Sequence, residues 1–244
     1  KIMKENMGID GRSQRQDSMM IEAHMKKLSR FGLLYTCNQN MVKEFSKKGE
    51  AIDESLQHYL KAGDRNEVSY HSDLSNGEKI SAALKEAKKI LSIAGDKYAS
   101  SQNYKNLTRV LCEQCNVDED GNYTLKEKGD PSLDASIMQS PVDPDATFRS
   151  KAGKQHRGYV ADMVEDVGEN GGIITDYSVE QNTHSDIDFE KESLEKAGSF
   201  QEGAPATRAV DGAYYSDETA KMAAEKKKNE EEREKFIREA KREA

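Results

Sequence analysis

Hydrophobic positions recur with helical spacing from about residue 25 onward. Leu28, Phe31, Tyr35 and Val42 are separated by three, four and seven residues, which places them on one face of a helix. Gly49 interrupts this pattern and is expected to end the helix.

Three further apolar runs follow before residue 115. The second covers residues 52–63, the third begins after Ser75, and the fourth covers residues 104–111. Ser75 followed by Glu78 is the pattern of a capping box, and Gly95 is expected to end the helix that it starts. The sequence therefore predicts an all-helical block over residues 25 to about 115.

Strand-like segments lie on both sides of this block. Glycines and prolines make residues 116–146 loop-like, and the turn sequence Glu169–Gly172 separates two runs that read as a β-hairpin. Residues 185–197 have a helical composition, and residues 217–244, rich in Lys, Glu and Arg, predict a solvated helix. The four predicted strands are Arg15–Ile21, Gly158–Val167, Gly172–Val179 and Thr207–Val210.

The order of these elements predicts an α/β or α+β fold with an insertion: strand, helical block, hairpin, helix, strand and terminal helix. We divide the chain into a first strand (1–24), a helical insertion with its loop (25–140), the remainder of the core (141–216) and a charged helical tail (217–244).

Composition excludes several classes of protein. The 244 residues can bury a core although only 35% are hydrophobic, and no run approaches the roughly 18 apolar residues of a membrane helix. The first residues lack the apolar segment of a signal peptide, and three cysteines are too few for a disulfide framework. We therefore expect a cytoplasmic protein with reduced thiols and no membrane partner. Because the chain opens on Lys1, we also expect a fragment.

The net charge of -8 argues against contact with nucleic acid, which needs a basic surface. One cluster of basic residues, by contrast, is compatible with contact with nucleic acid. It lies just before a predicted strand, and either a solvated face or contact with a DNA backbone would explain it. Its members are Arg149, Lys151, Lys154, His156 and Arg157.

Two aspartates occupy positions suited to chemistry, Asp17 in the first predicted strand and Asp211 at the end of the last. Carboxylates about 4 Å apart in one cleft would repel each other by about 4 kcal/mol at an effective dielectric constant of 20. A divalent cation removes this repulsion, and carboxylate oxygens suit Mg²⁺ or Mn²⁺. The alternative is structural: Asp17 a strand residue and Asp211 a turn former.

Two other patterns resemble metal sites only in part. Cys112 and Cys115 are half of a possible zinc site, but no second pair follows. Residues 118–122 begin like a calcium loop, but Tyr123 stands where that loop needs glycine. We expect a loop there.

Several motifs together resemble a known family. They are QRQDSMMIEAHMKKLSRFGLLY (14–35), DPDATFRSKAGKQHRGYVADMVEDV (143–167), IITDYSVEQNTHSD (173–186) and AVDGAYYSDE (209–218). In this order they look like the DDE-class transposases of bacterial insertion sequences, whose catalytic core is RNase H-like. In that family the first catalytic aspartate lies in mid-sheet and the second just after the fourth strand.

The resemblance implies an RNase H-like mixed sheet with a large helical insertion after the first strand. It also implies that Asp17 and Asp211 are catalytic and hold Mg²⁺ or Mn²⁺ for cleavage and transfer of DNA strands at the element ends. The partners would be DNA and, in a complete protein, further copies of the chain. The compartment would be the bacterial cytoplasm at the nucleoid.

The charged tail departs from the family, whose third acid is a glutamate on a helix beyond a further strand. Glu218, Glu225 and Glu230–Glu232 match no such motif, so no third acid is assigned. An inactive transposase remnant that binds DNA or protein is therefore the alternative function.

Overall fold

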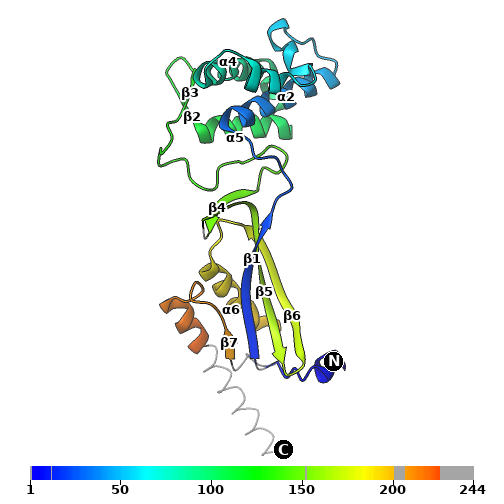
Figure 1. The fold of residues 1–244 in the computed structure, drawn as a ribbon, viewed down its shortest axis with the longest axis vertical. Coiled ribbons are helices and arrows are strands. Elements are labelled where there is room, and N and C mark those ends of the chain that lie inside the picture. Colours follow the sequence, from blue (N-terminus) through cyan, green and yellow to red (C-terminus); the bar gives the residue numbers. More distant parts are fainter. Residues whose placement is uncertain (1, 12, 152, 201–206, 226–244) are drawn as a thin grey trace, which may run out of the picture. The chain divides into compact units, whose positions relative to one another are not determined.

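The computed structural model describes residues 2–11, 13–151, 153–200 and 207–225 (Figure 1). The chain divides into two compact units. The first, here the sheet unit, comprises Lys1–Ile21 and Gly158–Ala244, and the second, the helical unit, comprises Glu22–Arg157. Each unit is described by itself.

The helical unit contains the predicted insertion, built around α2, α4 and α5. Aliphatic and aromatic side chains such as Met41, Tyr59, Ile90 and Leu107 are completely buried in its core. The helices and short helical turns are α2 (Arg30–Lys47), η1 (Glu54–Leu60), α3 (Asp64–Asn66), η2 (Glu67–His71), α4 (Asn76–Ala94), η3 (Gly95–Tyr98) and α5 (Gln102–Gln114).

Side-chain caps fix where the two longest helices begin. The Ser29 hydroxyl accepts a hydrogen bond from the Gly32 amide, so α2 starts five residues later than residue 25. The predicted capping box is confirmed, because Ser75 and Glu78 each bond the other's backbone N–H. Gly95 caps the C-terminus of α4, as the sequence indicates.

Two parts of the helical unit differ from the prediction. The second predicted helix, over 52–63, contains only the 3₁₀ helix η1, whose first turn is capped by Asp53. The segment predicted as loop contains a small antiparallel sheet of β2 (Cys115–Val117) and β3 (Tyr123–Leu125). Asp118 accepts hydrogen bonds from Asn122 and closes the turn between these strands.

The larger sheet is mixed and confirms an α/β class. Its strand order is β4-β5-β1-β7, and β6 pairs with β5. β1 and β7 are parallel, with Arg15 opposite Ala209, whereas β5 and β6 are antiparallel. The strands are β1 (Ser13–Glu22), β4 (Thr147–Lys151), β5 (Lys154–Gly168), β6 (Gly171–Gln181) and β7 (Thr207–Ala209).

All four predicted strands are present, and each differs from its predicted bounds by one to four residues at one or both ends. β5 begins at Lys154, four residues before the predicted start, and β4 forms where no strand was predicted. Gly171, with φ of 140°, follows the Glu169-Asn170 turn between β5 and β6. An L side chain rarely adopts this conformation, which explains glycine there.

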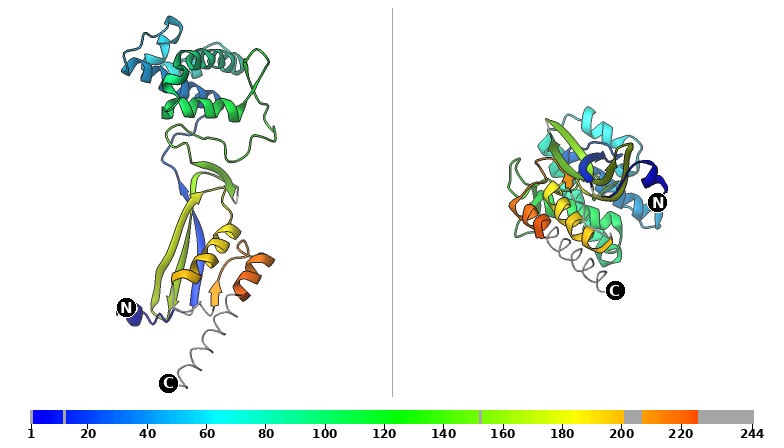
Figure 2. Two further views of the ribbon diagram at one scale, coloured as in Figure 1. Left: turned by 180° about the vertical axis from the view of Figure 1, so that it is seen from behind. Right: turned by 90° about the horizontal axis from the view of Figure 1, so that it is seen from below.

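In the sheet unit, helix α6 (Asp186–Phe200) packs against one face of the sheet, as Figures 1 and 2 show from opposite sides. The apolar core there is small, with Val160, Phe189 and Tyr214 buried and Met20 packed against them. The chain also has a short N-terminal helix, α1 (Ile2–Asn6). Polar contacts therefore hold much of this unit together.

The observed division of the chain differs from the sequence-based segments at both ends of the helical insertion. Residues 22–24 and 141–157, assigned to the core from sequence, group with the helical unit. Residues 217–225 of the predicted tail are helical, and the remainder of the tail lies outside the described residues. Within the described ranges, no helix has the length and apolar character needed to cross a membrane.

Candidate functional site

The side chains of β1 alternate between two faces of the sheet. Gln14 and Gln16 are buried on the face covered by α6, whereas Arg15 and Asp17 are exposed on the opposite face. The predicted aspartate therefore lies on the open face, where an ion or substrate could reach its carboxylate.

Strand pairing brings Asp211 to the same place. Because β7 runs parallel to β1 with Ala209 opposite Arg15, continuing the register by two residues leads to Asp211 beside Asp17. Both aspartates line one open depression of about 680 Å³. Arg15, Glu165, Met163 and Ile174 are among its other lining residues.

The two aspartates are available as ligands. Asp17 accepts a hydrogen bond of 2.8 Å from the Ser18 amide, and Asp211 accepts one of 2.7 Å from the Ala213 amide. Among the described residues neither carboxylate forms an ion pair. The third carboxylate of the depression, Glu165, forms an ion pair with Arg15.

A glycine makes room for Glu165. A Cβ at Gly172 would collide with the carboxylate end of that side chain. Glu165 therefore occupies the space next to β6 that residue 172 leaves open, and it would have to move if residue 172 carried a side chain.

The pair Asp17 and Asp211 fits a magnesium or manganese ion in its donor chemistry. Mg²⁺ is commonly held by one or two carboxylates, with water and substrate phosphates completing its octahedron. In the part of the chain that the structure describes, no group of three or more His, Cys, Asp or Glu side chains is placed to hold a metal. An ion at this site would thus depend on substrate oxygens for further ligands.

The face below α6 contains a buried polar layer that sequence reasoning missed. Asp162 accepts hydrogen bonds from Gln16 at 2.9 Å and from Tyr214 at 2.8 Å. Asp166 accepts from Gln14 at 2.8 Å and from Lys4 at 2.7 Å. The signal was present: Asp162 and Asp166 share the alternation of the buried Val160 and Val164.

Arg208 is the cation at the centre of this layer. Its guanidinium lies 3.2 Å from the carboxylate of Glu190 and donates to Gln14, Gln16 and Ser193 at 3.0 to 3.2 Å. Burial raises the pKa of Glu190, and Arg208 opposes that rise. Burial likewise raises the pKa of Asp162, opposed by its hydrogen bonds from Tyr214 and Gln16.

The layer therefore holds the strand that carries Asp17 and the strand that leads to Asp211. Gln16 directly precedes Asp17 on β1. Arg208 is a residue of β7 and lies three residues before Asp211. Tyr214, just beyond Asp211, is bound to Asp162 of β5. Three chain segments are thus joined by hydrogen bonds directly beneath the depression.

The residues of the predicted basic cluster differ in their contacts with the rest of the chain. His156 Nδ1 lies 2.7 Å from Glu22, and Arg157 donates to Gln139 at 3.2 Å while its guanidinium lies 5.2 Å from the Phe148 ring. Lys151 and Lys154 are exposed, and Arg149 is half-buried on β4. Arg157 and His156 thus have structural partners, and the lysines are the accessible cations.

The remaining sequence candidates are the cysteines and the glutamates of the tail. Cys112 is exposed and Cys115 is buried, and all three cysteines are free thiols. Among the tail glutamates, Glu218 pairs with Lys191 at 2.6 Å and Glu225 is exposed. Glu230–Glu232 lie outside the described residues.

Comparisons with protein-family models, with curated proteins and with solved structures return no match.

Proposed function

We propose that this chain carries the catalytic core of a DDE-class DNA transposase with an RNase H-like fold, which cleaves and transfers DNA strands in a metal-dependent reaction. One observation carries the proposal. Asp17 and Asp211, almost two hundred residues apart in sequence, line the same open depression.

The sheet topology supports the same fold assignment. β1 lies between β5 and β7, so Asp17 is in mid-sheet. Counting β1, β5, β6 and β7 as the four core strands, Asp211 follows the fourth. Both positions agree with the resemblance to transposases.

In the proposed reaction, Asp17 and Asp211 would hold Mg²⁺ or Mn²⁺, which supplies charge stabilisation at the attacking and leaving oxygens of a phosphodiester. Water attacks first, and the 3′-hydroxyl that it frees attacks the target strand. No protein side chain becomes covalently attached to DNA. Gln16 and Arg208 act as positioning residues, because they hold β1 and β7 in register.

The test is strand cleavage of end-labelled DNA with Mn²⁺. Asp17→Asn and Asp211→Asn are each expected to abolish cleavage, because an amide is a poorer ligand for a hard cation than a carboxylate. Glu180→Gln is the matched control: Glu180 is an exposed acid of β6 outside the depression, and its loss should leave cleavage unchanged. Wild-type rates in both aspartate variants would contradict the proposal.

A second function is favoured by the ion pair between Glu165 and Arg15. It leaves only two unpaired carboxylates in the depression among the described residues. We infer from this an alternative, an inactive remnant that binds DNA or protein. Metal titration with a nicked DNA substrate separates the two: a remnant binds DNA but shows no metal-dependent cleavage by the wild-type chain.

A further inference from the structure

The helical unit has a second, smaller depression, of about 460 Å³, at the start of α2. We call it the lysine pocket. Two segments of the chain supply its walls, and among the described residues no carboxylate lines it. Its polar lining residues include Lys26, Lys27, Ser29, Arg65, Ser69 and Tyr70.

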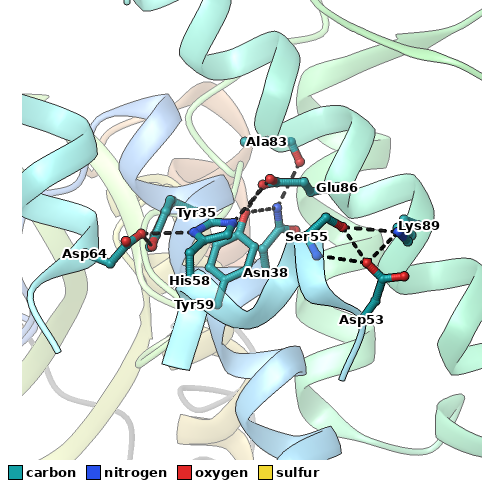
Figure 3. A network of polar contacts seen from close by, with 10 residues as sticks. All are labelled: Tyr35, Asn38, Asp53, Ser55, His58, Tyr59, Asp64, Ala83, Glu86 and Lys89. Atoms are coloured by element: carbon teal, nitrogen blue, oxygen red, sulfur yellow. Dashed lines mark hydrogen bonds and ion pairs between the residues drawn. The ribbon is translucent and has the colours of Figure 1, made fainter. Parts of the chain in front are cut away.

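No cation of the lysine pocket forms an ion pair with an acid in the part of the chain that the structure describes. Arg65 donates to the hydroxyl of Thr36 at 3.3 Å. The adjacent acid, Asp64, instead binds the Tyr35 hydroxyl and lies 3.0 Å from Nδ1 of His58, as Figure 3 shows. Lys26 and Lys27 are exposed, and neither forms an ion pair within the described residues.

His58 connects Asp64 to a wider network of polar contacts. Its other ring nitrogen lies 3.2 Å from Glu86, which also accepts a hydrogen bond of 2.6 Å from Tyr59 (Figure 3). Asp64 and Glu86 therefore have hydrogen-bond partners of their own.

A buried lysine adds to the positive potential. Lys79 of α4 is only 7% exposed, and its Nζ donates to the backbone carbonyl of Ser69, in the pocket wall, at 3.1 Å. An ammonium group buried beside a neutral carbonyl is costly unless a nearby anion compensates it. The N-terminus of the 18-residue helix α2 contributes positive potential at the same place.

An aromatic ring at the pocket points to the kind of anion. Tyr70 is 79% exposed, although large aromatic side chains usually bury their rings. Cationic grooves that carry exposed aromatic rings are typical of surfaces that bind nucleic-acid strands, where phosphates meet the cations and bases stack on the rings.

We propose that the lysine pocket binds a backbone phosphate of DNA and that Tyr70 stacks on an unpaired base of the same strand. The choice of DNA as the polyanion rests on the proposed function. The charge and the exposed ring do not depend on it. This interaction is separate from the basic cluster at 149–157.

The test measures binding of the full chain to a fluorescein-labelled 30-nucleotide single strand by anisotropy at several salt concentrations. Lys26→Gln combined with Lys27→Gln should weaken binding at least about tenfold and reduce the salt slope by about 0.7 for each phosphate that the variant no longer neutralises. Arg65→Gln should act in the same direction. Tyr70→Ala should weaken single-strand binding at least about fivefold, and duplex binding less.

Lys85→Gln combined with Lys105→Gln is the matched control, since both are exposed lysines of the helical unit outside the pocket. An equal loss in this control would overturn the proposal, because it would show a general effect of charge. Unchanged affinity and salt slope in the Lys26/Lys27 and Arg65 variants would also overturn it. Inorganic phosphate that stabilises the wild-type chain but not these variants, without any effect on DNA binding, would assign the pocket to a free anion instead.

The same assay separates this inference from the proposed function. Asp17→Asn should retain DNA affinity while it loses cleavage. If the wild-type chain binds DNA through the pocket but no metal supports cleavage, only the catalytic proposal fails. If cleavage depends on Asp17 but the pocket variants bind DNA normally, only the pocket proposal fails.

Discussion

Replacing Arg208 with methionine should destabilise the sheet unit severely. The side chains of Arg208 and Glu190 are 10% and 9% exposed, so the pair is buried. Removing the guanidinium leaves the Glu190 carboxylate without its cation and takes a donor away from Gln14 and Gln16. Breaking a buried ion pair in this way costs about 3–5 kcal/mol. That is a large part of the about 5–15 kcal/mol that stabilises a typical domain.

The loss of stability caused by Arg208→Met should depend on pH, and the titration of Glu190 determines the direction of that dependence. Burial raises its pKa above the ordinary value of 4.5 in the folded chain. The folded state therefore keeps the proton to a higher pH than the unfolded chain, and this contribution to stability is lost as pH rises from 4.5 through the raised pKa. Without Arg208 the pKa rises further. Arg208→Met should thus cost more near pH 7 than near pH 4.5.

Hydrogen exchange read by mass spectrometry measures this prediction, because it reports stability segment by segment. Peptides from β1 and β7 should lose protection in Arg208→Met, while those from α2 and α4 should not. Arg15→Met is the matched control: Arg15 is 66% exposed in its pair with Glu165, and an exposed pair contributes about 0–1 kcal/mol.

Two results would refute the reasoning. One is a loss of stability in Arg208→Met no larger than that in Arg15→Met. The other is a loss that does not shrink toward pH 4.5. Adding Glu190→Met to Arg208→Met removes the stranded charge and should recover at least about 1 kcal/mol, since a buried pair can often be replaced by apolar groups at little cost.

Two further predictions concern the helical unit. Iodoacetamide at pH 8 should label Cys112, which is exposed, and leave Cys37 and Cys115 unlabelled. Burial raises the thiol pKa values of Cys37 and Cys115 to about 12 and about 11, so neither forms much reactive thiolate at pH 8. Peptide mapping that finds Cys37 alkylated in the folded chain would contradict this prediction. Ser75→Ala should lower the free energy of unfolding, measured by urea denaturation, by about 1 kcal/mol, since it removes the hydroxyl that caps α4 and bonds Glu78. An unchanged denaturation midpoint would show that the capping box contributes nothing to stability.

Local sequence was sufficient for the elements whose signals are local. The capping box at Ser75, the turn before Gly171 and the helical period of α2 each depend on a few neighbouring residues. The helix predicted over 52–63 was largely wrong because Asp53 caps a 3₁₀ turn, which periodicity alone does not distinguish from an α-helix. The strand β4 was missed because its five residues pair with β5, and this pairing is not visible in the composition of the segment.

The sequence by itself determined the alternation that places Asp17 on one face of a strand, and the position of Asp211 just after another. Only the tertiary structure decided that the two share a depression, because the parallel register of β1 and β7 joins segments almost two hundred residues apart. It also decided which charges are free to act. Arg157 and His156 looked equivalent to Lys151 and Lys154 in sequence, yet the first two bind neighbouring side chains. Asp162 and Glu190, for which no function was predicted from the sequence, are buried beneath the site. Contacts between distant segments of the chain determine which residues become buried.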